Sequence, residues 1–189
     1  MTDAFTLFSI ESRYCIDTNV IVSFLHEDDD EPYRRDAFAA QWSVVETMIG
    51  SGEIIAPRRV ELELVKWEKE IPTMKGWLAK RSGMFVDMTS DQLASAKRIV
   101  NDYPDYGSKN NYIADLEVIS LASVRKLVVI TNERIRPTVT LNSPKIPEVC
   151  ARYGFECLSV SGFLAREMPK KASQEGVAGD RAMEAASRQ

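Results

Sequence analysis

The sequence has little of what several common classes of protein need. It contains one histidine, His26, and three cysteines, Cys15, Cys150 and Cys157, without a Cys-x-x-Cys pair. A single histidine excludes, within one chain, a metal-free cleavage of RNA that uses two histidines as acid and base. Three scattered cysteines exclude a disulfide framework and disfavour a cysteine zinc site.

Long hydrophobic runs and an excess of positive charge are also missing. No apolar run approaches the ~20 residues of a membrane span, and the N-terminus lacks the basic and apolar stretches of a secretory signal. Lys and Arg number 24 against 28 Asp and Glu, so the net charge is −4, which disfavours a simple basic nucleic-acid-binding domain. We therefore expect a soluble cytoplasmic protein with reduced thiols.

The composition of the 189 residues, 44% apolar and 28% charged, is that of one globular domain with a core. It changes near the C-terminus, where residues 169–189 include few large apolar side chains. Such a segment cannot bury much surface, so it predicts a flexible tail after a folded unit over 8–168. A short helix over Asp180–Ser187 is an alternative for part of the tail.

Short apolar runs alternate with segments of helical period along the folded unit. We expect strands at Tyr14–Ile16, Glu53–Ala56, Leu127–Ile130 and Phe155–Leu158. We expect helices at Thr18–Leu25, Ala37–Ile49, from Pro57 until Pro72, around Met74–Leu78, after Thr89, at Tyr112–Val124, Ile146–Arg152 and Ser161–Met168, and a polar loop at Asn101–Asn110. Strands separated by helices predict an α/β fold, a three-layer α/β/α sandwich with a central, mainly parallel sheet.

Acidic residues follow the two clearest strands of this sheet. Asp17 comes directly after the first strand, and Glu133 follows the strand Leu127–Ile130. The carboxyl ends of parallel strands meet at one edge, which is where ligands bind in such sheets. Asp115 in an apolar helix and Glu63 near the inward face of another could join them. Carboxylates crowd together only when something neutralises them, and Mg²⁺ or Mn²⁺ suits oxygen ligands.

Each acid also has an ordinary structural interpretation. Asp17 could cap the helix that follows it, and Asp115 could be an exposed helical acid paired with a nearby Lys or Arg. Glu61 competes with Glu63 for the inward position. Glu133 could balance Arg134 on a loop. The order and context of the four acids carry more weight than any one of them.

Four segments in this order resemble the PIN domain family. They are Tyr-Cys-Ile-Asp17-Thr-Asn-Val-Ile, Pro57-Arg-Arg-Val-Glu-Leu-Glu63-Leu, Ala114-Asp115-Leu-Glu-Val-Ile-Ser-Leu-Ala122 and Val129-Ile-Thr131-Asn-Glu133. The segment Lys145–Phe155 looks like a PIN branch long catalogued as a domain of unknown function. The resemblance covers roughly 12–168.

The resemblance implies a metal-dependent endoribonuclease that hydrolyses phosphodiester bonds of RNA, with Mg²⁺ or Mn²⁺ as cofactor. It further implies the toxin of a toxin–antitoxin pair, a cognate antitoxin protein as partner, and a homodimer. By resemblance, the acids that bind metal and carry catalysis are Asp17, Glu63, Asp115 and Glu133. Asn19 would orient the first acid, and Thr131 would support the site or touch a phosphate. The family usually has Asp where this chain has Glu133.

Other charged and aromatic residues have two interpretations each. Arg134 and Arg136 follow the proposed site and could bind a substrate phosphate, or they could be surface charge. The acidic run from Glu27 to Glu31 is typical of a solvated loop. Three tryptophans at helical spacing favour packing or an oligomer face before base stacking: Trp42, Trp67 and Trp77.

Three rival functions differ in what they require. A phosphotransferase of the haloacid dehalogenase type needs a second Asp two residues after the first, where this chain has Asn19. A generic nucleotide-binding domain needs a glycine-rich phosphate loop, which is absent. A PIN-like domain with a degenerate metal site, acting as a protein-binding or regulatory module, is kept open by Glu133.

Overall fold

The computed structural model describes residues 11–108, 112–136 and 144–168. The tail predicted at 169–189, with its alternative helix, lies outside the described residues. Within the described ranges, no helix is both long and apolar enough to cross a membrane.

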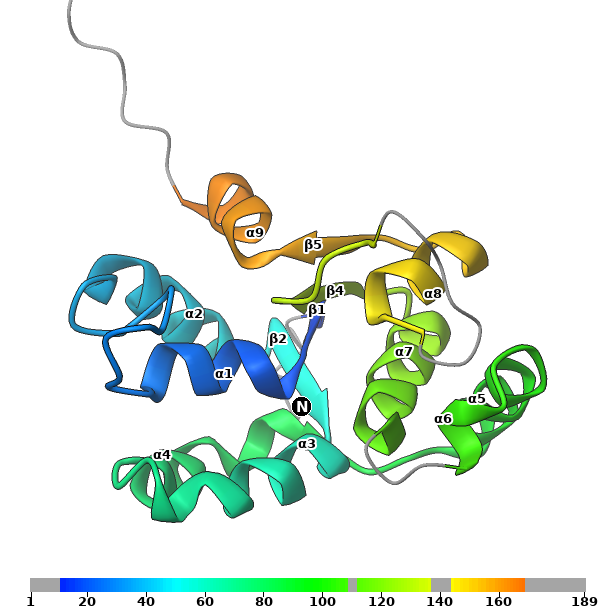
Figure 1. Ribbon diagram of the computed structural model, residues 1–189, viewed down its shortest axis with the longest axis horizontal. Helices are drawn as coiled ribbons and strands as arrows, with labels where there is room; N and C mark the ends of the chain where they lie inside the picture. The colour runs from blue at the N-terminus through cyan, green and yellow to red at the C-terminus, as the bar shows by residue number, and fades with distance from the viewer. Residues whose placement is uncertain (1–10, 109–111, 137–143, 169–189) are drawn as a thin grey trace, which may run out of the picture.

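A five-stranded, all-parallel sheet forms the centre of the fold, with strand order β3-β2-β1-β4-β5 (Figure 1). The strands are β1 Tyr14–Ile16, β2 Ile54–Pro57, β3 Phe85–Val86, β4 Val128–Thr131 and β5 Cys157–Ser159. The predicted α/β class and the parallel sheet are therefore confirmed.

Strand β1 is the middle strand and has the most buried sequence of the sheet. Tyr14 lies opposite Ile54 of β2 and Val128 of β4, and no residue of β1 is more than 1% exposed. Both faces of a parallel strand are covered by crossover helices, so a run of apolar residues is the sequence that suits it. The chain leaves this buried strand directly at Asp17.

Helices cover both faces of the sheet (Figure 1). In one layer, helix α7 packs on β1, β2 and β4, and α8 packs on β5. In the other layer, α2 packs on β2, and α9 packs on β4 and β5. The α-helices are α1 Thr18–Leu25, α2 Ala39–Ser51, α3 Arg58–Leu64, α4 Met74–Arg81, α5 Ser90–Asp102, α6 Asp105–Ser108, α7 Ile113–Arg125, α8 Ile146–Tyr153 and α9 Val160–Glu167. The 3₁₀ helices are η1 Val65–Lys69 and η2 Ser82–Met84.

Local signals located several helix ends correctly. Thr89 and Gln92 form both bonds of a capping box at the start of α5, as their spacing predicts. Gly52 ends α2 in the left-handed conformation, with φ of 84°, which glycine adopts without steric cost.

The structure differs from the predicted elements in two places. Strand β3 was not predicted, because its two residues are too few to show the alternation that identifies a strand in a sequence. The described part of the expected polar loop at Asn101–Asn110, residues 101–108, instead contains the end of α5 and all of α6. Tyr106 of α6 is fully buried, and its ring lies 6.3 Å from that of Tyr103 and 5.7 Å from that of Tyr112. This tertiary contact outweighs the polar composition of the segment.

Candidate functional site

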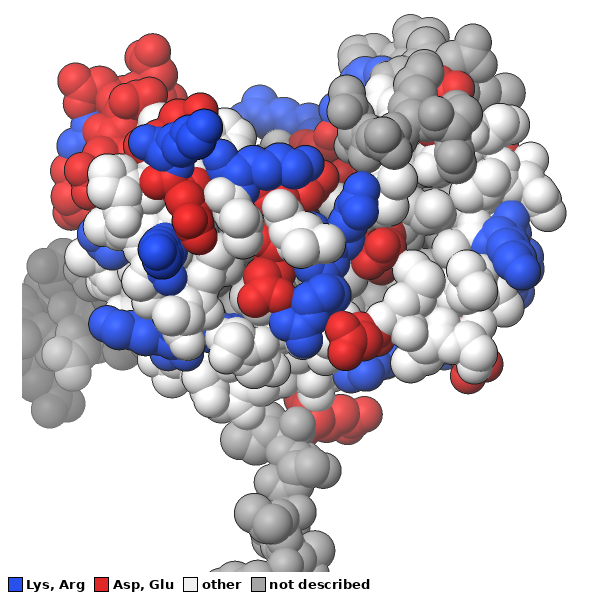
Figure 2. Space-filling view, turned by 90° about the horizontal axis from the view of Figure 1, so that it is seen from below, with Lys and Arg blue, Asp and Glu red and all other residues white. Residues whose placement is uncertain are grey.

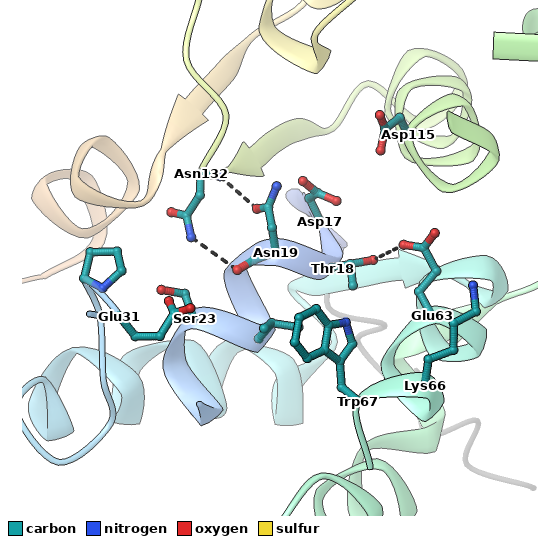
Figure 3. A pocket seen from close by; sticks show the side chains of 12 residues that line it. Asp17, Thr18, Asn19, Ser23, Glu31, Glu63, Lys66, Trp67, Asp115 and Asn132 are labelled. Atoms are coloured by element: carbon teal, nitrogen blue, oxygen red, sulfur yellow. Dashed lines mark hydrogen bonds between the residues drawn. The ribbon is translucent and has the colours of Figure 1, made fainter. Parts of the chain in front are cut away.

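A cavity of about 650 Å³ opens at the carboxyl edge of the sheet (Figure 3). Side chains from the end of β1, from α1, α3, η1 and α7, and from the segment after β4 surround it. Its lining residues are Asp17, Thr18, Asn19, Val22, Ser23, Glu31, Pro32, Glu63, Lys66, Trp67, Asp115 and Asn132. The topology therefore brings three of the four predicted acids to one space.

Asp17 stands at the end of β1 with its side chain almost entirely buried. Its backbone N–H donates to the carbonyl of Ile130 (3.0 Å), which continues the β1–β4 pairing to this residue. Asp17 occupies the N-cap position of α1, but its side chain makes no capping bond. The hydroxyl of Thr131 donates to its Oδ2 (2.8 Å). Asp17 therefore lies at the start of α1, as its ordinary structural interpretation expects, but it makes no side-chain capping bond there.

Burial changes the acidity of two carboxyl groups at the cavity. It raises the pKa of Asp17 to about 7, and the charges of Glu133 and Glu63 raise it as well, against the hydrogen bond from Thr131. Burial also raises the pKa of Asp115 to about 8, with further increases from the nearby acids. Both shifts have the same cause: water is excluded and negative charges lie close together.

Glu63, and not Glu61, faces the cavity. The hydroxyl of Thr18 donates to Oε2 of Glu63 (2.8 Å), which ties α3 to the start of α1. Glu61 instead forms an ion pair with Arg58, one turn earlier on the same helix (2.6 Å). Figure 3 shows the carboxyl groups of Asp17, Glu63 and Asp115 approaching one region from three different elements.

A hydrogen-bond network behind Asp17 fixes its position. Thr131 is fully buried, and its hydroxyl accepts from the N–H of Glu133 (3.1 Å) and from Nδ2 of Asn19 (3.4 Å) while it donates to Asp17. Asn19 in turn accepts from the N–H of Asn132 (3.0 Å). We expected Asn19 to orient the first acid itself. Instead it does so through Thr131, because the Thr131 hydroxyl lies between the two side chains.

Replacing Thr131 with valine is expected to lower the free energy of unfolding by about 2 kcal/mol, because valine leaves several buried polar groups without a partner. Urea denaturation would measure the change. The matched control is Thr47→Val, since the exposed Thr47 hydroxyl bonds only within α2 (to the Ser43 carbonyl, 2.8 Å). Equal stability of the two variants would contradict the role of Thr131.

The fourth predicted acid, Glu133, is not among the residues that line the cavity. Its Oε1 accepts from the ammonium group of Lys145 (2.5 Å), and its Oε2 accepts from the N–H of Ile146 at the start of α8 (2.8 Å). Both oxygens are therefore engaged in holding the segment after β4 against α8. Its charge is still close enough to raise the pKa of Asp17 and Asp115.

Arg136 takes part in the same connection between the segment after β4 and α8. Its Nε and Nη2 donate to the two carboxylate oxygens of Glu148 (2.9 and 2.8 Å), whose side chain is 1% exposed. Arg134 is exposed on the same segment. Neither arginine belongs to the cavity lining, and the substrate-binding role suggested for them stays a prediction.

The donor set at the cavity fits one kind of cation site and not another. Among the described residues, no group of three or more His, Cys, Asp or Glu side chains lies close enough together to hold a metal ion. A closed cage made by protein ligands is thus not present in this part of the chain. Mg²⁺, however, is usually held by one or two carboxylates, several waters and the substrate phosphate. Asp17 and Asp115 can supply such a pair.

Several cavity residues were not expected at the site. Lys66 of η1 and Ser23 of α1 were not singled out from the sequence. Trp67 of η1 was interpreted as a packing residue or an oligomer face before base stacking, and Glu31, after the exposed acids Glu27–Asp30, as part of a solvated loop. Those four acids confirm the predicted solvated loop, whereas Glu31 is half-buried. No local pattern distinguishes these residues, since only the fold turns them toward one space.

Positive and negative side chains are mixed on the molecular surface seen in Figure 2. Acidic side chains gather at the upper left of that view, and no broad positive area covers the part of the face that the structure describes. This agrees with the near balance of charges in the sequence and gives no sign, on that face, of a surface that would follow a nucleic-acid backbone.

In a comparison with known families, a family model described as "Domain of unknown function (DUF4411)" matches residues 14–170. A comparison with curated proteins finds no match.

Proposed function

The chain belongs to the DUF4411 family, which is defined as a domain of unknown function. From its site, we propose that it is a PIN-type, metal-dependent endoribonuclease that hydrolyses phosphodiester bonds of RNA. The observation that carries this proposal is the meeting of Asp17, Glu63 and Asp115 at one cavity on the carboxyl edge of a parallel sheet. The order of these acids in the PIN-like motifs supports it.

In this proposal, some residues of the cavity would bind the metal ion, water or phosphate, and others would hold those ligands in position. Asp17 and Asp115 would hold Mg²⁺ or Mn²⁺, and Glu63, fixed by Thr18, would accept hydrogen bonds from water at the same place. A bound divalent ion would supply the charge that activates water for attack on phosphorus. Thr131 holds the Asp17 carboxylate in one orientation. Lys66, exposed at the wall, would attract the phosphate.

Metal binding tests this proposal directly. Titration calorimetry of the full chain with MnCl₂ is expected to show saturable binding, and Asp115→Asn is expected to weaken it at least ~10-fold because one of the two carboxylates proposed to hold the ion is lost. Asp91→Asn, which changes an exposed acid of α5, should bind as the wild type does. No saturable uptake in the wild type would contradict a metal-dependent enzyme.

That negative result would favour the second candidate, a domain with a degenerate site that acts through protein contacts. The engagement of Glu133 by Lys145 and Ile146, away from the cavity lining, is the observation in its favour. A toxin role with a cognate antitoxin, a homodimer and a cytoplasmic location belong to the ribonuclease proposal and rest on the resemblance alone.

A further inference from the structure

The cavity extends well beyond its acidic end. Figure 3 shows Ser23 and Glu31 at the end opposite Asp115, with Trp67 between the two ends. Val22 and Pro32 complete the wall there. The total volume of about 650 Å³ falls within the roughly 300–1,000 Å³ typical of sites that enclose a small ligand. A metal ion and its waters would fill only a part of it.

Ser23 gives independent evidence that this end receives a ligand. The residue is 3% exposed and lines the cavity, yet its hydroxyl has no hydrogen-bond partner among the described residues. Buried polar groups in native proteins are nearly always bonded, so an unpartnered one needs an explanation. Its oxygen is covered in this structure, so the side chain would rotate toward the cavity, where the hydroxyl can both donate to and accept from a polar group of a bound molecule.

Trp67 supplies a stacking surface in the middle of the cavity. It is half-buried on η1, and the ring of His26 meets it edge-to-face, with ring centroids 6.0 Å apart and planes at 85°. Trp42 and Trp77, by contrast, are less than 10% exposed, with ring centroids 6.1 Å apart, as expected for packing residues. An indole face at a cavity wall is the kind of surface on which nucleic-acid bases stack.

Glu31 adds a hydrogen-bond acceptor at the same end. Its N–H donates to the carbonyl of Asp28 (3.1 Å), which closes a turn at this point of the loop. Glu31 is half-buried, whereas the acids before it are exposed. An ionised carboxylate only accepts hydrogen bonds, at two oxygens side by side. Guanine is the base whose Watson–Crick edge offers two adjacent N–H donors, and unpaired bases are read on that edge.

We propose that the end of the cavity formed by Ser23, Glu31 and Trp67 is a nucleoside-binding subsite that prefers guanosine. The base stacks on Trp67, its donating edge meets Glu31, and the hydroxyl of Ser23 bonds to the same nucleoside. This inference deepens the proposed function, because a nucleoside seated here would place a neighbouring phosphate toward Asp17 and Asp115. It makes the enzyme one that cleaves single-stranded RNA beside a guanosine.

Nucleoside binding tests the subsite without depending on cleavage or metal. Calorimetry or ligand-observed NMR of the full chain, with no metal added, is expected to show saturable binding of guanosine at least ~5-fold tighter than that of uridine. Trp67→Ala is expected to weaken both at least ~10-fold, while Trp67→Phe, which keeps a stacking ring, restores most of the affinity. Ser23→Ala should weaken binding several-fold.

Glu31→Gln tests the preference separately from the affinity. We expect guanosine and uridine to bind this variant within about twofold of each other, with uridine unchanged, whereas Glu27→Gln on the exposed part of the loop should keep the full preference. Far-ultraviolet circular dichroism checks that each variant is folded. Failure of the wild type to bind guanosine, or unchanged binding by Trp67→Ala, would overturn the subsite.

The outcome can be separated from that of the proposed function. Asp17→Asn should bind guanosine as the wild type does, because the acidic end is not needed for stacking. Guanosine binding without RNA cleavage would overturn the ribonuclease and leave the subsite standing. RNA cleavage without guanosine binding would overturn the subsite alone.

Discussion

Replacing Asp17 with asparagine is expected to reduce Mn²⁺-dependent cleavage of single-stranded RNA by roughly 10³-fold or more, because the substitution removes a charge from the centre of the proposed site. The fold should survive. Burial already favours the neutral form of this carboxyl group, and asparagine keeps its shape and an oxygen that can accept from Thr131. A time course with a labelled oligonucleotide and a thermal unfolding curve measure the two effects.

Asp30→Asn is the matched control for this prediction. It makes the same chemical change at an exposed position of the loop after α1, so cleavage should stay within about twofold of the wild type. Cleavage by Asp17→Asn at the wild-type rate would refute the assignment of Asp17 as a catalytic residue. Loss of activity together with loss of the folded state would instead assign Asp17 to stability.

Replacing Glu148 with alanine is expected to have the largest effect on stability, a loss of about 2–3 kcal/mol in the free energy of unfolding, because several hydrogen bonds to a buried carboxylate are lost while the partly exposed Arg136 stays solvated. Glu148 is buried and accepts from Arg136 at both oxygens, and its Oε2 also accepts from the N–H of Lys145 (3.1 Å). Its removal takes away the carboxylate that accepts from Nε and Nη2 of Arg136 and frees the segment after β4 from α8. Urea denaturation at neutral pH measures the loss.

Glu156→Ala is the control, because Glu156 also pairs with an arginine, Arg166, but both side chains are well exposed. Exposed pairs contribute little, so a loss below about 1 kcal/mol is expected there. Equal losses for the two variants would contradict the structural role assigned to Glu148.

The same ion pair, between buried Glu148 and partly exposed Arg136, predicts how acid destabilises the protein. The hydrogen bonds from Arg136 lower the pKa of Glu148 to about 2, from 4.5. A carboxyl group whose pKa is lower in the folded state stabilises fully above its unfolded pKa, and this contribution disappears as the pH falls from 4.5 towards 2. The wild type should therefore lose more stability than Glu148→Ala between pH 5 and pH 2.5. Parallel stability curves for the two proteins would contradict this.

The structure divides the predicted site residues into two groups. One cavity is lined by Asp17, Glu63 and Asp115. This was predictable from the hydrophobic periodicity of the helices and from the rule that parallel strands end at one edge of the sheet. Glu133 and Arg136 instead connect the segment after β4 to α8, through Lys145 and Glu148. The sequence places those two partners 12 residues away and contains no local signal that they return to the same place.

The sequence by itself determined the class of the fold and the edge at which chemistry could occur. Apolar runs such as Tyr14–Ile16 specify buried parallel strands. Because all parallel strands end at the same edge of the sheet, the residue after such a strand must lie at that edge. The tertiary structure alone decided which oxygens are free and which are bonded. It engaged Glu133 with Lys145 and, within the part of the chain that the structure describes, gave the hydroxyl of Ser23 no partner. Hydrogen-bond partners depend on distances between segments far apart in the chain, which no local pattern encodes.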